Sequence, residues 1–364
     1  MSAHTLAPSQ IAWKDLLKSL GNQQCVLLIG PNLLPGENLF LSLLRHLGID
    51  PEDITDSLPK DIAMVYPAEN LFLFPNVAAR TRIWRRFEEF YNEHLETLRP
   101  LYTQIARLPF PVVINTMPDL GLRRSFEQDG ILHQFSYYDY RGTPEPYDRI
   151  QGSPRDTRLL FNICGVLSDP DSLVLTHDDL FGYFSHILSQ KLSSEHYIDL
   201  KHTLKNATDF IFLGFQFDQW RTQMLLRLLN PERNKGIQYA VNPALAAETR
   251  VFFADQFEVE FVDSISPAEF LTELCSRWTA EEEQRQTAGA PLKQTLRDWL
   301  RQGLLTRILE RMDQTPVQAD ATFQLSRLST LRKSIRDSVL SSESALLEMN
   351  KIRKAVQELI EILP

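Results

Sequence analysis

The sequence predicts an α/β fold in which helices cover both faces of a mostly parallel sheet, followed by a small all-α helical bundle. Two observations predict the sheet. Short apolar runs alternate along the chain with stretches whose apolar residues recur every three or four positions. Parallel strands need crossover connections, and helices supply them. The bundle is predicted by a third observation, a sustained helical seam of apolar residues near the C-terminus.

Length and composition set the outer bounds. The chain has 364 residues, more than one ordinary domain needs. Its 43% hydrophobic and 23% charged residues are typical of a globular protein, and no apolar run approaches the roughly 20 residues that would cross a bilayer. The first ten residues lack the basic and apolar regions of a secretory signal. We therefore expect a cytoplasmic protein without a membrane span.

Cysteine usage and charge exclude further classes. Cys25, Cys164 and Cys275 are widely spaced and form no C-x-x-C pair, so we expect reduced thiols, no disulfide framework and no metal site. A net charge of -9 argues against a nucleic-acid footprint over the whole surface.

The predicted elements follow in chain order. Six apolar runs are expected to be buried strands: 25–29, 112–114, 173–175, 210–213, 237–241 and 259–262. Five amphipathic stretches are expected to be helices: 37–47, 78–105, 178–188, 219–229 and 267–278. Residues 132–135 could form one more strand.

A change of charge marks the domain boundary. Residues 291–364 hold 12 Lys and Arg against 9 Asp and Glu, whereas the rest of the chain holds 26 against 38. The polar stretch 279–291 has no hydrophobic periodicity. We therefore predict a body over residues 1–278, a linker over 279–291 and a helical domain over 292–364.

In a parallel sheet the ligand crevice lies at the carboxyl ends of the strands, so the residues after each strand are the candidates for function. Gly30, Pro31 and Asn32 follow the first strand. A single glycine indicates a tight turn more than a phosphate site, and Pro31 lacks an amide that a phosphate would use. Thr116 and Asp119 follow the next strand, where Asp119 could cap a helix or take part in catalysis.

Later strands also end on polar or flexible residues. One ends at Gly214, with Asp218 placed to cap the next helix, and another ends at Asn242. Polar strand ends that share one crevice are consistent with a nucleotide site, although turn chemistry explains each of them alone.

The run Phe161-Asn162-Ile163-Cys164-Gly165 and the segment 168–180 resemble the part of sirtuin-like proteins that carries their catalytic His-Gly pair. The resemblance covers residues 22–278 and implies a Rossmann-like domain that binds NAD or an ADP-ribose-type nucleotide. The family's motifs, taken in order, match Gly30, Thr116, Asp119, Gly165, Gly214, Asp218 and Asn242, and Asn32 joins them as an implied cofactor-binding residue.

The departures fall at the positions that matter most for the family's chemistry. Met117 stands in place of the family's Asn, Cys164 in place of its catalytic His, and Gln216 in place of a small Ser. Deacylation and NAD cleavage both depend on that Asn and His, so neither carries over. The four-Cys zinc module is missing too, as it is in the sirtuin-like domains of bacterial defence proteins, which this chain resembles.

Three residues are weak candidates for a replacement catalytic group. His177 and His133 could each face the crevice and act as a base, because imidazole titrates near neutral pH. His177 could equally lie in an exposed first helical turn, and His133 could be a packed strand residue. Cys164 could be a nucleophile, or a small buried thiol that fills the space of the lost imidazole.

The C-terminal region predicts a bundle. Leu292, Leu296 and Leu300 mark a first helix that Gly303 ends, and further apolar spacings mark helices over 304–312 and 328–335. A seam then extends over Ala345, Met349, Ile352, Val356, Leu359 and Leu363, with Ser341 or Ser342 as its N-cap.

Three segments, 296–303, 328–332 and 350–355, resemble parts of the effector-associated, or bacterial death-like, adaptor domains at the ends of defence proteins. An oligomerisation bundle of no special family is the alternative. The resemblance implies partners that carry a like helical adaptor, or a homo-oligomer.

Together the two halves suggest a component of a bacterial conflict or antiphage defence system. In the first reading, a degenerate sirtuin-like body binds NAD or a related nucleotide as a sensor and is recruited through the adaptor. In the second, it is an NAD-hydrolysing effector that uses other residues, and in the third it is a non-catalytic scaffold whose crevice is filled by side chains such as Leu33, Met117 and Gln216.

Overall fold

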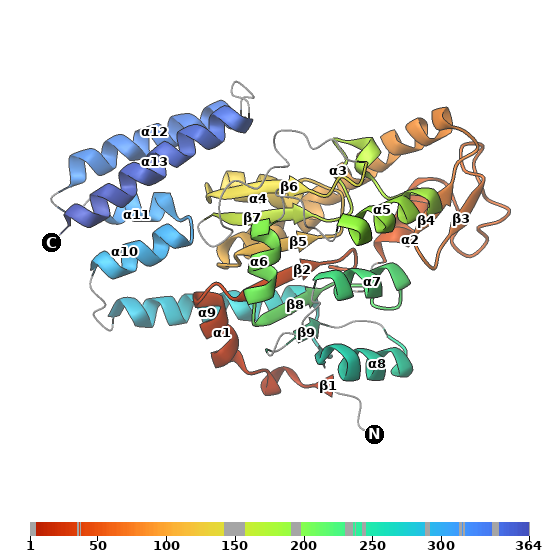
Figure 1. Ribbon diagram of the computed structural model, residues 1–364, viewed down its shortest axis with the longest axis horizontal. Helices are drawn as coiled ribbons and strands as arrows, with labels where there is room; N and C mark the ends of the chain where they lie inside the picture. The colour runs from red at the N-terminus through yellow and green to blue at the C-terminus, as the bar shows by residue number, and fades with distance from the viewer. Residues whose placement is uncertain are drawn as a thin grey trace.

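The computed structural model describes residues 5–34, 36, 38–141, 157–190, 198–229, 236, 238–241, 245–287, 292–312, 315, 317–336 and 342–363. It shows an α/β body and, at one end of the body, a helical bundle made of α10, α11, α12 and α13 (Figure 1). We call this bundle the adaptor bundle.

The main sheet of the described residues has eight strands, all parallel, in the order β1-β10-β9-β8-β2-β5-β7-β6. From β2 the sheet grows first toward β5, β7 and β6, and then on the other side through β8, β9 and β10. The strands are β1 (Thr5–Leu6), β2 (Cys25–Ile29), β5 (Val112–Asn115), β6 (His133–Tyr137), β7 (Arg158–Asn162), β8 (Asp209–Leu213), β9 (Gln238–Val241) and β10 (Val259–Val262).

Strand β2 shows why the short apolar runs become central strands. All five of its residues are buried, because helices lie on both faces of the sheet. Cys25, Leu27 and Ile29 join the hydrophobic core on one face, and Val26 and Leu28 join the core on the other.

Helices cover both faces. The first core is completed by α1 (Trp13–Gly21), α2 (Leu39–His46), α3 (Val77–Arg107), α4 (Gly121–Gln128) and α9 (Pro267–Thr287). The second is completed by α5 (His177–Gln190), α6 (Ile198–Asn206), α7 (Trp220–Leu229) and α8 (Ala247–Phe257). The predicted α/β fold with helices on both faces is confirmed.

A two-stranded antiparallel hairpin, β3 (Met64–Tyr66) and β4 (Leu71–Leu73), lies outside the main sheet. It projects at the end of the body opposite the adaptor bundle (Figure 1). The amide of Phe72 donates to the carbonyl of Leu175 over 2.8 Å, which joins the hairpin to the segment before α5.

Two strand assignments differ from those predicted. Leu173 and Val174 are buried and Leu175 is half-buried, but the three lie in an irregular segment, because Leu173 and Val174 contribute to opposite cores beside the hairpin instead of extending the sheet. The strand of this region is β7, whose apolar run of three residues lies between the buried polar residues Arg158 and Asn162. The possible strand at His133 is confirmed as β6.

The adaptor bundle has helices where the spacing predicts them. They are α10 (Leu292–Arg301), α11 (Leu305–Met312), α12 (Gln318–Arg336) and α13 (Ser342–Ile362). Gly303 has a φ of 74°, which only glycine adopts easily, and it follows the end of α10 as expected. The seam residues Ile352, Val356 and Leu359 are buried in the bundle core. Ser341 lies outside the described residues.

The predicted linker is in part helical. Helix α9 continues to Thr287, so residues 279–287 extend the last helix of the body. Their polar composition conceals this, because a helix without a wide buried face has no apolar periodicity. Residues 288–291 lie outside the described residues.

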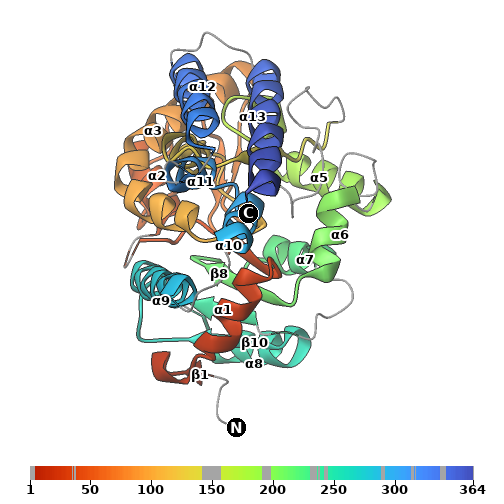
Figure 2. The ribbon, with the colours of Figure 1, turned by 90° about the vertical axis from the view of Figure 1, so that its left-hand side faces the viewer.

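Figure 2 views the molecule from the side on which the adaptor bundle lies, and polar contacts join this bundle to the body. They are Gln23 Nε2 to Arg301 O at 3.1 Å, Leu132 N to Gly303 O at 3.2 Å, Arg332 Nη2 to Gly130 O at 3.1 Å, Arg353 Nη1 to Thr157 Oγ1 at 3.1 Å and Arg307 Nη1 to Glu282 Oε2 at 2.9 Å. A Cβ atom on Gly130 would lie 1.6 Å from Arg332 Nη2, so a side chain at this position would displace the end of the Arg332 side chain.

Candidate functional site

The strand order places the candidate site between β2 and β8. The chain builds the sheet outward from β2 in one direction and later in the other, and such a switch point leaves a crevice at the carboxyl ends of the two strands. The turn after β2 contains Gly30, and the turn after β8 contains Gly214. These two predicted site residues therefore lie side by side.

The two turns close on each other through their backbones. Gly30 N donates to Leu213 O at 2.8 Å, and Asn32 N donates to Gly214 O at 2.9 Å. A Cβ atom on Gly30 would lie 2.3 Å from Gly214 O. Since Pro31 has no N–H, the amides that would hold a phosphate after β2 are either used or missing.

Thr116 and Asp119, which follow β5, also make structural hydrogen bonds. Thr116 donates to Ile29 O from both its amide and its hydroxyl, at 3.0 and 3.1 Å. The Asp119 carboxylate accepts from Gly121 N at 2.8 Å and from Tyr102 Oη at 3.1 Å. Asp119 is 2% exposed, and this burial raises the pKa of its carboxyl. Met117 is buried in the first core.

The segment after β7, which resembles the family's His-Gly pair, places Cys164 at the crevice. Gly165 follows it with a φ of 87°, and a Cβ atom there would lie 2.3 Å from Ser172 O, so only glycine allows this tight loop. Burial raises the pKa of the Cys164 thiol, and the Arg221 guanidinium lowers it less than burial raises it. Cys164 is therefore a protonated thiol at neutral pH and a poor nucleophile.

Asp218, in the turn after β8, does not have the capping role that the sequence predicts. Asp218 is exposed and makes no hydrogen bond within the described part of the chain, so it does not cap α7. Instead, Trp220 N, at the start of α7, donates to the carboxylate of Glu69 at 3.2 Å. Gln216 accepts from Asn70 Nδ2 at 2.9 Å. Asn242 lies outside the described residues.

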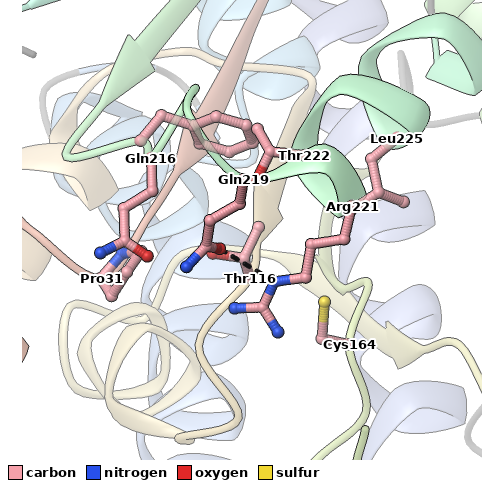
Figure 3. A pocket seen from close by; sticks show the side chains of 9 residues that line it. Pro31, Thr116, Cys164, Gln216, Gln219, Arg221, Thr222 and Leu225 are labelled. Carbon is pink, nitrogen blue, oxygen red and sulfur yellow. Dashed lines mark hydrogen bonds between the residues drawn. The ribbon is translucent and has the colours of Figure 1, made fainter. Parts of the chain in front are cut away.

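A small cavity remains in the crevice, with a volume of about 20 Å³ (Figure 3). It is lined by Pro31, Thr116, Cys164, Phe215, Gln216, Gln219, Arg221, Thr222 and Leu225. That volume holds about one water molecule, whereas pockets for drug-sized ligands measure roughly 300 Å³ or more. The residues present therefore do not fit NAD in this arrangement.

Arg221 is the site residue that motif reading missed. Its side chain extends from α7 toward Cys164 and Thr116, and its Nε donates to Gln219 Oε1 at 2.9 Å (Figure 3). Within the described residues, no carboxylate forms an ion pair with it. A cation in the first turn of a helix is unfavourable with the helix dipole. The position of Arg221, shortly after the Gly214–Asp218 segment and at the start of α7, was therefore the signal in the sequence that it has another role.

The two candidate histidines lie away from this cavity. His133 is the first residue of β6, at the amino end of the sheet, where its Nδ1 lies 2.8 Å from Ile131 O and burial lowers the pKa of its imidazole. It is a packed strand residue and cannot serve the crevice. His177 begins α5 and packs edge-on against Tyr66, with ring centroids 4.4 Å apart. It is not among the cavity residues.

Neither a metal centre nor a membrane-spanning helix is found among the described residues. No three His, Cys, Asp or Glu side chains gather there as metal ligands. No described helix combines the length and apolar character needed to cross a membrane.

Comparison with protein families gives two matches. Residues 111–258 match a SIR2-like domain, and residues 291–364 match effector-associated domain 11. The first match includes Thr116, Cys164 and Gly214 but begins after Gly30. Comparison with curated proteins gave no match. The chain therefore combines a SIR2-like domain with a C-terminal effector-associated domain.

Proposed function

We propose that this chain is a recruitment and signalling component of a bacterial conflict or antiphage defence system, and that its SIR2-like body does not cleave NAD by the sirtuin route. A SIR2-like domain joined to an effector-associated domain fits a defence-associated effector module. The observation that carries the proposal is the contact between the two turns, in which Asn32 gives its amide to Gly214 and Gly30 gives its amide to Leu213 at the end of β8.

The chemistry of the crevice supports the same proposal. Cleavage by the sirtuin route needs a base and a residue that orients the ribose, whereas Cys164 and Met117 stand in those places. Burial keeps Cys164 protonated, and Met117 is 2% exposed in the core. Neither side chain can accept a proton from a ribose hydroxyl at neutral pH.

The adaptor bundle would supply the recruitment. We expect it to bind proteins that carry a like helical domain, or a second copy of this chain. Its exposed apolar side chains include Phe323 on α12 and Leu347 and Ile362 on α13, and exposed apolar side chains are available for protein contacts.

A nucleotide sensor is the second candidate function, and Arg221 favours it. A guanidinium that lines the crevice and pairs with no described carboxylate is a group that binds phosphate well. Binding NAD or an ADP-ribose derivative would require the crevice to open, because its present volume is far too small.

The test uses the full chain, alone and with a protein that carries an effector-associated domain. NAD breakdown is followed by chromatography and NAD binding by calorimetry, with Arg221→Gln as the matched variant. We expect complex formation with the partner and no NAD breakdown in either sample. NAD binding that Arg221→Gln abolishes would establish the sensor instead. Breakdown that depends on Cys164 or His177 would establish an NAD hydrolase and overturn the proposal.

A further inference from the structure

The turn between β3 and β4, residues 67–70, lies against the turn that joins β8 to α7. Two side chains make the contact. Asn70 Nδ2 donates to Gln216 Oε1 at 2.9 Å, and Glu69 Oε1 accepts from Trp220 N at 3.2 Å. Gln216 also lines the crevice cavity. The 67–70 turn therefore covers one edge of the crevice, although its hairpin is not part of the main sheet.

Glu69 caps the N-terminus of α7, a role that a residue directly before the helix usually has. The first amides of α7 have no partner within the helix, and the helix dipole favours a carboxylate there. Gln219, directly before the helix, uses its side-chain oxygen for Arg221, and Asp218 is exposed. The helix is thus capped by a residue 151 positions away in the sequence.

The Glu69 contact is only half satisfied. Its Oε2 atom is buried and has no hydrogen-bond partner. Burial raises the pKa of the carboxyl; Asp218 also raises it, and the Arg221 guanidinium and the amides of Trp220 and Arg221 lower it. Asn70, next in the chain, has a φ of 55°, in the left-handed region that asparagine tolerates better than most residues other than glycine. The closed turn therefore holds a carboxyl group with one buried, unsatisfied oxygen.

We propose that the 67–70 turn is a lid over the crevice, that Glu69 is its latch on α7, and that the lid tightens as the pH falls and loosens as Glu69 ionises. The sign follows from linkage, because burial raises the pKa of the Glu69 carboxyl by more than the amides at the start of α7 lower it. A carboxyl that holds its proton more tightly in the closed arrangement than in water favours that arrangement at low pH. Opening gives Oε2 access to water and releases Gln216, which lines the cavity beside Cys164 and Arg221. This inference concerns access to the crevice and is independent of the recruitment function proposed above.

The test is hydrogen exchange of the full chain at pH 5 and pH 7, corrected for intrinsic rates, in peptides that cover 64–73 and 216–222. We expect wild-type exchange to be slower at pH 5 than at pH 7 by about fivefold, the factor expected for one hydrogen bond. Glu69→Gln mimics the protonated latch and should be protected at both pH values. Glu69→Ala removes the latch and should exchange fast at both.

Two controls separate the latch from its surroundings. His177 packs on Tyr66, the last residue of β3, so His177→Phe keeps a ring there and should leave the pH dependence intact. Glu52→Gln changes an exposed carboxylate elsewhere and should behave like the wild type.

Alkylation of Cys164 at one fixed pH gives an independent readout. Cys164 lines the cavity, so Glu69→Ala should increase its alkylation rate by about fivefold while Cys25 and Cys275 react as before. The lid is overturned if Glu69→Ala exchanges and reacts like the wild type. The latch is overturned if wild-type protection rises with pH, or if His177→Phe removes the pH dependence that Glu69→Gln retains.

Discussion

The backbone amide of Asn32 donates a hydrogen bond to the carbonyl oxygen of Gly214 over 2.9 Å, although the two residues follow different strands. The contact exists because β2 and β8 are parallel neighbours, so their carboxyl ends lie at the same level. The same topology that creates a ligand crevice also brings the two turns close enough to fill it. In this chain the turns bind each other, which leaves the crevice with a small cavity.

Replacement of Gly30 by Ala should destabilise the body. The new Cβ atom would lie 2.3 Å from Gly214 O and 2.6 Å from Phe215 Cα, and both are backbone atoms that cannot rotate away. We expect a loss of about 2 to 4 kcal/mol in the free energy of unfolding, typical of overpacking at a close backbone contact. Urea denaturation followed by circular dichroism measures it.

Gly48→Ala is the matched control. Gly48 has a φ of 79°, and nothing lies within 4 Å of the position of its Cβ atom, so only backbone strain applies. Its cost should be about 1 kcal/mol. Equal losses for the two variants would contradict the tight contact between the turns.

Restoring the family's catalytic residues should not restore NAD cleavage. The double variant Met117→Asn, Cys164→His would replace the two decisive departures, yet the amides of Gly30 and Asn32 would stay bound to Leu213 and Gly214. We expect NAD breakdown to remain at background in a chromatographic assay. Wild-type chain and a buffer blank serve as controls, and measurable turnover by the variant would show that the closed turns are not the barrier.

The sequence predicts the sheet well where strands consist of apolar residues alone. The run at 25–29 is fully buried between two helical layers, and no other structure suits five such residues. Strand β7 has an apolar run of only three residues, and its ends could not be predicted this way, because Arg158 and Asn162 are buried through contacts made elsewhere: Arg158 donates to Ala106 O and Leu108 O at the end of α3. Such contacts leave no local pattern.

The candidate site also has a part that the sequence predicts and a part that only the structure shows. Gly30, Thr116, Cys164 and Gly214 could be grouped from the sequence, because each follows a strand or lies near the end of one. The bonds between the two turns were beyond prediction, since they depend on the exact approach of two backbones. Glu69 belongs to the site through a bond to a helix far away in sequence, and neither its position nor its neighbours indicate that.

The carboxyl of Asp119 should make stability depend on pH in an unusual direction. Burial raises its pKa, although the hydrogen bonds from Gly121 and Tyr102 lower it. A folded carboxyl that binds its proton more tightly than the unfolded one contributes most stability below the unfolded pKa and loses it as the pH rises. Relative to Asp119→Asn, which does not titrate, the wild type should therefore be more stable at pH 4 than at pH 7.

Urea denaturation at the two pH values measures this difference. Asp53→Asn is the control, because Asp53 is exposed and should show no such trend. A wild type that gains stability relative to Asp119→Asn as the pH rises would mean that the hydrogen bonds outweigh burial.

Glu282 should couple the adaptor bundle to the body. Its carboxylate, 12% exposed, accepts from Arg307 Nη1 at 2.9 Å, and the Arg307 guanidinium lies 4.4 Å from the centre of the Trp299 ring. Glu282 also stabilises the charged form of Arg158: burial lowers the pKa of the Arg158 guanidinium, and the Glu282 carboxylate raises it. Because Arg307 is 43% exposed, solvent screens the pair, and we expect a coupling energy of about 1 kcal/mol.

A double-mutant cycle of Glu282→Gln and Arg307→Gln measures that coupling. Each single variant should lower the denaturant midpoint at which the adaptor bundle separates from the body, read from Trp299 fluorescence, and the double variant should cost less than the sum of the two. Glu52→Gln should leave the midpoint unchanged. Strictly additive losses would mean that the ion pair does not hold the bundle, so the backbone contacts of Leu132 and Gly130 would have to hold it instead.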